Sequence, residues 1–198
     1  MMKSVIRHAL CVAVLFCLLS GVRAQSVKVN VPLLLTGSPN GSVEFTMTRQ
    51  LTFSGEVAWM PYLFKKKEEV FRALQTCGEI RYYTNPRNFY TNDSWDGFFI
   101  GPYGMYGNFN IGLFRNGDKK SYRRKGWGVS AGISTGYKFA FNPRWGLELN
   151  IGIGYAHIQY SKYYLGGEYA DFPLERKKTK VWIGPTKFGV NLTYNLFR

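Results

Sequence analysis

The stretch WGLELNIGIGYAH, residues 145–157, alternates large apolar side chains with small or polar ones. The apolar positions are Trp145, Leu147, Leu149, Ile151, Ile153 and Tyr155. Because successive side chains of a strand point to opposite faces, this alternation predicts a β-strand with one apolar face. The stretch also has the length of about 9–11 residues with which a tilted strand crosses a membrane.

The same alternation recurs along the chain. It is clear in residues 127–138 and 187–196, and shorter in 27–31, 43–48 and 52–59. Two weaker segments are 77–84 and 96–110, and the two faces of the second stay unassigned. The total is about eight strands, an even number as in bacterial single-chain barrels. The predicted fold is therefore all-β, an eight-stranded antiparallel up-and-down transmembrane β-barrel.

The connections between these strands alternate in length. Short reversals are predicted at 49–50 and 142–144, with a longer one at 85–94, and these form the periplasmic end. External loops are predicted at 36–41, 65–76, 111–125 and 162–180. Unequal connections of this kind are typical of outer-membrane barrels. The segment FKKKEEVFRALQ, residues 64–75, spaces Val70, Phe71 and Leu74 as a short helical turn would.

Alternation alone also fits a soluble, lipocalin-like barrel with its apolar face inside. Three features favour a membrane. The polar face is rich in Gly and Ser, which suits a crowded lumen better than a solvent face. Trp and Tyr gather near strand ends, as in interfacial girdles. The girdle candidates are Trp59, Tyr62, Tyr82, Tyr83, Trp95, Trp127, Trp145, Tyr160, Tyr163, Tyr164 and Tyr194. The chain also ends in an amphipathic strand, although its last residue is Arg198.

The N-terminal segment carries an export signal. Residues 1–24 combine Lys3 and Arg7, an apolar run and a small-residue site at Ala24, which predicts a cleaved signal peptide followed by one barrel domain, 25–198. Cleavage lowers the formal charge from +14 to +11 and leaves Cys77 as the one remaining cysteine. For an exported basic protein we expect lipid and lipopolysaccharide, not nucleic acid, as partners. The predicted location is the outer membrane of a Gram-negative bacterium, reached through the barrel-assembly machinery.

Several blocks carry a family resemblance. They are PLLLTGSPNGSVEFTM, EIRYYT, KGWGVSAGISTGYKF, NPRWGLELNIGIGYAHIQYSKY and GPTKFGVNLTY, in this order. In these blocks the chain resembles a family of small outer-membrane barrels of Bacteroides-type bacteria, known as a domain of unknown function. The resemblance implies an outer-membrane location and gene clusters that often encode fimbrial subunits or their anchors. It implies no catalytic residues.

Charged residues fall on the polar face of the predicted strands, four of each sign. This set, the lumen network, is Lys28, Glu44, Glu56, Glu79, Arg81, Lys138, Glu148 and Lys187. Buried charges need partners, and eight strands leave an interior only wide enough for side chains. The pattern favours an ion-paired plug; a proton or ion path is the alternative.

Basic residues gather in the predicted external loops. They are Lys65, Lys66, Lys67, Arg72, Lys119, Lys120, Arg123, Arg124, Arg176, Lys177 and Lys178. All of these except Arg72 are candidate anion-binding residues, because clustered Lys and Arg pair readily with phosphates. A solvated rim is the other interpretation.

His157 is the one histidine left after cleavage, and its parity with Tyr155 predicts a lipid-facing position. A lipid A deacylase has His-x-Ser with a nearby acid, whereas this chain has His157-Ile158-Gln159, with Ser161 two residues further. We therefore predict no catalytic residues, no cofactor and no metal. The predicted role is that of a non-enzymatic structural or surface-interaction barrel, linked to a fimbrial or other surface-appendage system, with fimbrial or other surface proteins as partners. A lipid A-modifying enzyme and a narrow transport or ligand-binding barrel are the alternatives.

Overall fold

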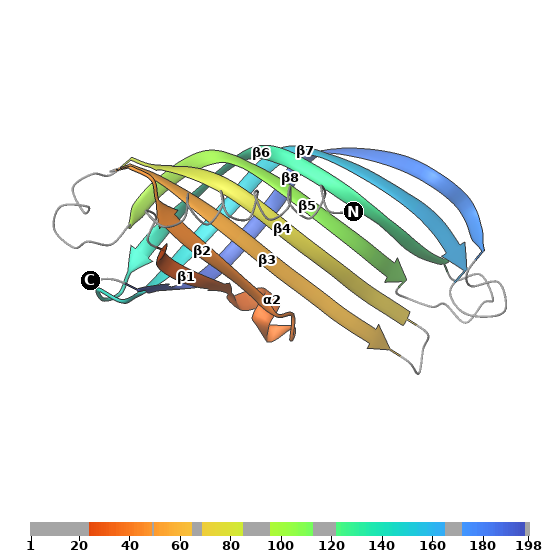
Figure 1. Cartoon of the computed structure of the whole chain (residues 1–198), viewed down its shortest axis with the longest axis horizontal. Coiled ribbons are helices and arrows are strands. Elements are labelled where there is room, and N and C mark those ends of the chain that lie inside the picture. Colours follow the sequence, from red (N-terminus) through yellow and green to blue (C-terminus); the bar gives the residue numbers. More distant parts are fainter. Residues whose placement is uncertain are drawn as a thin grey trace, which may run out of the picture.

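The chain folds into one ring of eight antiparallel strands with a short helix (Figure 1). The computed structural model describes residues 24–48, 50–64, 69–84, 96–112, 122–164 and 172–196. Its elements are β1 Ala24–Asn30, α2 Val31–Leu35, β2 Asn40–Thr46, β3 Leu51–Phe64, β4 Glu69–Tyr83, β5 Gly97–Gly112, β6 Tyr122–Ala140, β7 Trp145–Tyr164 and β8 Pro173–Asn195. Each strand pairs with the next, and β8 pairs with β1, so the predicted eight-stranded up-and-down barrel is confirmed.

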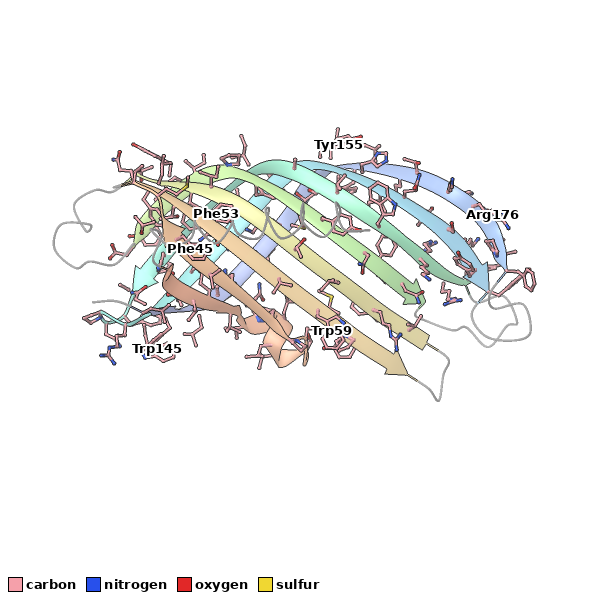
Figure 2. The ribbon with its side chains drawn as sticks, in the orientation of Figure 1. Phe45, Phe53, Trp59, Trp145, Tyr155 and Arg176 are labelled. Carbon is pink, nitrogen blue, oxygen red and sulfur yellow. The ribbon has the colours of Figure 1, made fainter. Side chains whose placement is uncertain are left out.

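The strands direct their apolar faces outward and their polar faces into the lumen. In β7, Glu148 and Asn150 are buried, whereas Ile151 and Ile153 lie on the outer surface, with Ile153 61% exposed. The outer surface carries apolar side chains from the other strands as well, among them Phe53, Val57, Ile80, Ile100, Ile133, Val181 and Leu192. Figure 2 shows Tyr155 on this surface, and Trp145 and Arg176 at opposite ends of the barrel.

In β5 the structure assigns the faces that the sequence left open. Phe99 and Tyr103 point inward and are buried, while Phe98, Ile100 and Tyr106 point outward. Aromatic residues and glycines occur at both parities of this strand, so side-chain type alone could not separate the faces.

Glycines let the lumen side of neighbouring strands pack closely. A Cβ on Gly132 would lie 2.5 Å from the Gly154 Cα, and one on Gly136 would lie 2.5 Å from the Phe99 ring. The backbone therefore packs too closely at these two positions for a larger side chain. At Gly128 the nearest atoms would stand 3.4 Å away, so its packing is looser.

The barrel closes along only half of its length. β1 pairs with β8 over five residues, from Ser26 with Asn195 to Asn30 with Asn191. The ladder between β2 and β3 ends at Asn40 and Ala58. Beyond these points, in the part of the chain that the structure describes, residues 60–64 of β3 pair with β4 alone and residues 173–190 of β8 pair with β7 alone. We call the part of the barrel that includes β1 and β2 the closed half, and the part beyond the ends of β1 and β2 the open half.

The short helix α2 lies between β1 and the predicted loop at 36–41, where no helix was predicted. The Asn30 side chain accepts a hydrogen bond from the Leu33 backbone N–H at 3.2 Å, and Pro32 stands in the first turn. An Asn cap followed by Pro is a favourable helix start, which ends the strand one residue earlier than alternation predicts. No helix among the described residues is long and apolar enough to span a membrane.

Two predictions about connections are wrong. The helical turn predicted at 64–75 is strand from Glu69 onward, because Val70 to Gln75 pair with β3 on one side and β5 on the other. Strands β6, β7 and β8 also extend well into the loops predicted at 111–125 and 162–180. The short reversal at 142–144 is confirmed: the Asn142 side chain accepts from the backbone N–H groups of Arg144 and Trp145. The reversal predicted at 85–94 lies outside the described residues.

Candidate functional site

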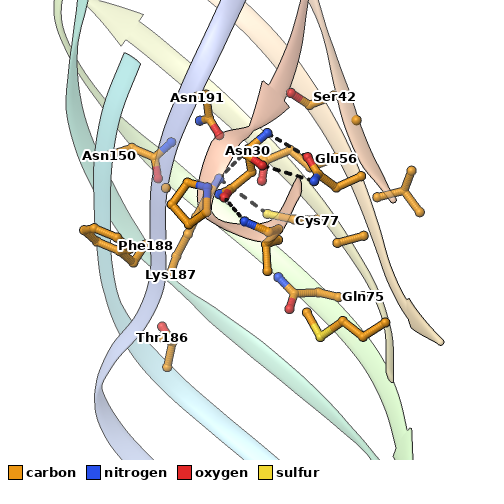
Figure 3. A pocket seen from close by; sticks show the side chains of 18 residues that line it. Asn30, Ser42, Glu56, Gln75, Cys77, Asn150, Thr186, Lys187, Phe188 and Asn191 are labelled. Carbon is orange, nitrogen blue, oxygen red and sulfur yellow. Dashed lines mark hydrogen bonds and ion pairs between the residues drawn. The ribbon is translucent and has the colours of Figure 1, made fainter. Parts of the chain in front are cut away.

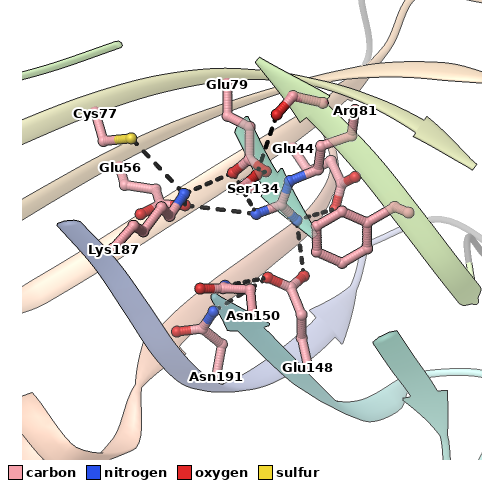
Figure 4. Close-up of polar contacts among 12 residues, drawn as sticks. Glu44, Glu56, Cys77, Glu79, Arg81, Ser134, Glu148, Asn150, Lys187 and Asn191 are labelled. Carbon is pink, nitrogen blue, oxygen red and sulfur yellow. Dashed lines mark hydrogen bonds and ion pairs between the residues drawn. The ribbon is translucent and has the colours of Figure 1, made fainter. Parts of the chain in front are cut away.

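Arg81 of β4 stands at the centre of the lumen network (Figure 4). Its guanidinium lies 2.8 Å from the Glu148 carboxylate, 2.9 Å from Glu79, 3.5 Å from Glu56 and 3.8 Å from Glu44. Its side chain is fully buried. These glutamates come from β2, β3, β4 and β7, so a single fork of donors joins strands on opposite sides of the lumen.

Two lysines complete the ion pairs. The Lys28 ammonium lies 2.5 Å from the carboxylates of Glu44 and Glu148, and the Lys187 ammonium lies 2.7 Å from Glu56 and 2.6 Å from Glu79. Each ammonium is thus in contact with two carboxylates. All these side chains except Glu56 are nearly or fully buried, so the ion pairs contact little water.

Lys138 is the exception among the eight residues. It is buried and donates to the Asn195 side chain at 3.4 Å, and no carboxylate stands within ion-pair distance of it among the described residues. The structure thus brings all eight predicted residues into the closed half of the lumen and joins seven of them by ion pairs.

Neutral side chains that the sequence analysis missed complete the network. The hydroxyls of Thr52 and Tyr83 donate to Glu44 at 2.6 and 2.9 Å, and the amides of Asn150 and Asn191 donate to Glu148 at 2.9 and 3.1 Å. Ser134 donates to Glu79. Parity in the strands is the signal that could have found them, since each lies on the same face as a network charge.

Tyr83 corrects a prediction. It was predicted to be a girdle residue beside Tyr82, but its ring is buried in the lumen and packs 5.5 Å from the ring of Phe99. The Arg81 guanidinium lies 4.4 Å above the same Phe99 ring. Since adjacent residues of a strand face opposite ways, only Tyr82 can lie on the outer surface.

A cavity of about 240 Å³ lies above the lumen network, beside α2 (Figure 3). Glu56, Cys77 and Lys187 meet at its floor, where the Lys187 ammonium stands 3.7 Å from the Cys77 sulfur. Asn150 lines the cavity too, and its Oδ1 has no hydrogen-bond partner among the described residues although the residue is only 4% exposed.

A second cavity of about 370 Å³ lies against the inner face of the open half. Its wall is largely apolar and includes Met105, Phe109, Ile158 and Trp182. Gln75 and Thr186 line both cavities, so the two adjoin. The lumen therefore changes along the barrel, from ion pairs in the closed half to an apolar wall in the open half.

The structure describes five of the ten candidate anion-binding residues, and these lie in strands where loops were predicted. Arg123 and Arg124 belong to β6, and Arg176, Lys177 and Lys178 belong to β8. Arg123 lies over the Tyr163 ring at 5.1 Å. The hydrogen bond from Lys178, at 3.0 Å, lowers the pKa of the exposed Glu175 carboxyl. Lys65, Lys66, Lys67, Lys119 and Lys120 lie outside the described residues.

His157 lies on the outer face of β7, as predicted. Its ring stands 6.2 Å from that of Trp127, and the residues paired with it in β6 and β8 are Val129 and Val181. It therefore has no acid or hydroxyl directly opposite in either neighbouring strand. Among the described residues, no group of three or more His, Cys, Asp or Glu side chains could hold a metal ion.

The comparisons with known proteins bear on the family and not on the chemistry. No curated protein and no solved structure matches the chain. A family model described as "Protein of unknown function (DUF3575)" matches residues 8–196, nearly the whole sequence. The predicted resemblance to a domain of unknown function is thereby confirmed, and the chain belongs to the DUF3575 family of proteins of unknown function.

Proposed function

We propose that the chain is an integral outer-membrane β-barrel with a structural or surface-interaction role, and not an enzyme. One observation carries the proposal: the barrel has its charges inside and its apolar side chains outside. Arg81, Glu44 and Glu148 are fully buried in the lumen, while Ile133, Ile153 and Phe188 are 61–71% exposed on the outer surface. In water both the buried charges and the exposed apolar surface would be unfavourable. Buried ions lose hydration, and large exposed apolar patches are rare in soluble monomers.

In a bilayer the same arrangement is favourable. Hydrocarbon would cover the outer side chains, and the ion pairs of the lumen network compensate the charges within. Aromatic pairs near one end, such as Trp145 with Tyr194 at 4.9 Å between ring centroids, suit the interface between lipid and water. The predicted signal peptide and the final amphipathic strand supply the route, through the barrel-assembly machinery of a Gram-negative bacterium.

The lumen network supports a role outside the barrel and not through it. Ion pairs and hydrogen bonds join β1, β2, β3, β4, β7 and β8 across the closed half, which opposes a continuous aqueous path. The opposite end carries the basic extensions of β6 and β8, whose Arg and Lys side chains suit the phosphates of lipopolysaccharide. Surface or fimbrial proteins are the further partners that we propose at this end.

Fractionation of a Gram-negative host that expresses the full chain tests the proposal. We expect the protein in the outer-membrane fraction, resistant to extraction by carbonate, and with a mobility in cold SDS gels that changes on boiling. A variant that lacks residues 1–24 is the matched control and should stay in the cytoplasm. Recovery of the full chain in the soluble periplasm would contradict the proposal.

A further inference from the structure

We propose that the two adjoining cavities bind a single-chain amphiphile whose head group donates hydrogen bonds, and that the molecule enters sideways between β3 and β8. The inference rests on the membrane location proposed above and identifies the ligand class of the lumen. The head group would reach the floor formed by Glu56 and Asn150, and the chain would lie on the apolar wall that contains Trp182.

The lateral opening follows from the strand register. The ladders of β1 and β2 end with the closed half. Beyond them, no ladder among the described residues joins residues 60–64 of β3 to residues 173–190 of β8. The apolar outer surface of β8 includes Val181 and Ile183, so the opening begins at a level where lipid would surround the barrel. Backbone without a ladder partner is tolerated at that depth only where it is buried in protein or lines a water-filled cavity.

Helix α2 lies at the base of this opening. The Tyr62 hydroxyl of β3 donates to the Thr36 backbone carbonyl and hydrogen-bonds the Ser38 hydroxyl, so the turn after α2 is attached to β3. On the other side Leu33 and Phe188 line the same cavity. The helix therefore borders the opening without filling it.

The edges themselves resist strand addition, which argues against a partner strand as the occupant. β3 carries Pro61, and β8 carries Pro173 and Pro185, none of which has a backbone N–H to donate. The register between β7 and β8 shifts at Gly152/Ile153, and β8 bears a run of lysines beyond it. Proline, bulges and lysine are the features with which proteins protect sheet edges.

The polar atoms at the cavity floor that could bind a head group are hydrogen-bond acceptors, so the head group must be a donor. The Asn150 amide nitrogen already donates to Glu148, so the unpaired Oδ1 cannot be satisfied by turning the amide, which would set two oxygens against each other. Glu56 is a second acceptor at the cavity, with its side chain 24% exposed. Lys187, the cation nearby, is already in contact with Glu56 and Glu79. Hydroxyl or ammonium head groups therefore fit, and an anionic head group does not.

The size and lining of the space suit one chain. The cavities measure about 240 and 370 Å³, within or just below the range of about 300–1,000 Å³ typical of small-molecule sites. Met105, Phe109 and Ile158 offer a continuous apolar wall above the polar floor. Since the wall belongs to the open half, an alkyl chain could lie along it with its end towards the lateral opening.

Titration calorimetry on the full mature barrel in phosphatidylcholine nanodiscs tests the proposal. The probes are dodecyl glucoside, dodecylamine and dodecyl phosphate below their micellar concentrations, with empty nanodiscs as the background. We expect one saturable site for the glucoside or the amine and none for the phosphate. Equal binding of the phosphate, or no saturable binding of any probe to an inserted barrel, would overturn the inference while leaving the membrane location intact.

Variants locate the site. Asn150→Leu should bind about 10-fold more weakly, since one hydrogen bond to the head group is lost. Thr193→Val is the matched control, because Thr193 is buried in the lumen but does not line either cavity. Glu56→Gln should weaken dodecylamine more than the glucoside, which separates the two head groups. Unchanged affinity of folded Asn150→Leu would overturn the assignment of the floor.

Trp182→Ala provides a second test that does not touch the lumen network. Trp182 is half exposed, so the barrel should fold without it. We expect weaker binding of dodecyl glucoside and little change for octyl glucoside, whose shorter chain reaches less of the wall. An equal loss for both chain lengths, or no loss for either, would contradict the placement of the chain.

Discussion

At the scale of single residues, Arg81 shows how the lumen tolerates so many buried charges. Four carboxylates lie within 4 Å of its guanidinium, and none of the four is joined to it alone. Lys28 and Lys187 share those carboxylates, so three cations face four carboxylates, and the buried Lys138 brings the formal charge of the network to zero. A buried ion pair of this kind need not add net stability, but removal of one member leaves the others uncompensated.

Arg81→Ala should therefore lower the free energy of unfolding by about 3–5 kcal/mol, the typical cost of leaving buried charges without a partner. Urea unfolding of the refolded barrel in detergent micelles measures it. Arg72→Ala is the matched control, since Arg72 lies exposed in the same strand. A loss for Arg81→Ala no larger than for Arg72→Ala would show that the network does not stabilise the fold.

Gly132 shows how closely the strands of the lumen wall pack. Its substitution by Ala should lower the free energy of unfolding by about 1–3 kcal/mol, because the added Cβ would meet backbone of β7 that cannot move freely. Gly104→Ala is the control, because a Cβ there would meet nothing within 4 Å. The same unfolding assay compares them, and equal stability of the two variants would contradict the argument.

At the scale of elements, α2 depends on a small number of hydrogen bonds. Tyr62 connects the turn after the helix to β3 through Thr36 and Ser38, and Asn30 begins the helix. Tyr62→Phe removes the first connection and keeps the ring. We expect faster amide exchange in residues 33–38 and little change in β7, measured by hydrogen–deuterium exchange with mass spectrometry. Unchanged exchange in residues 33–38 would show that packing alone holds α2.

The extensions of β6 and β8 form the basic end of the barrel. Arg123, Arg124 and Lys178 pair in register with residues of β7. Lys177 lies at a shift of that register, where its backbone N–H donates to the Ser161 hydroxyl. Their joint substitution by Gln should reduce the lipopolysaccharide that co-purifies with the barrel, and added salt should weaken the wild-type interaction. Arg144→Gln, a change at the other end, is the control. Equal lipopolysaccharide in the two preparations would count against anion binding at this end.

At the scale of the whole molecule, the barrel combines a closed half filled by charges with an open half that is hollow. The closed half should block conduction, because its ion pairs cross the lumen from β4 to β7 and from β8 to β3. We therefore expect no large steady conductance from the purified barrel in planar bilayers. Long-lived openings of uniform size would contradict the closed lumen, whatever ligand the open half holds.

Much of the lumen network follows from the sequence because side chains in strands have a period of two. Once the outward face of β7 is known, Glu148 must point inward, and pairing carries the same parity to Lys138 in β6 and Asn191 in β8. The same rule holds for Tyr83, and the prediction was wrong there because it gave the aromatic pair with Tyr82 more weight than parity. It was silent in β5, where both parities carry aromatics.

Residue patterns were enough to predict the alternation, the number of strands and most of the faces that meet in the lumen, since these depend on local backbone geometry. The pairing of each glutamate with its cation, and the closure of the barrel over only half of its length, became clear only in the folded barrel. Those features depend on the lengths of β1 and β2 relative to their neighbours and on distances between residues far apart in the chain, such as Lys28 and Glu148. Local patterns carry no information about such distances, because they arise only when the ring of strands is complete.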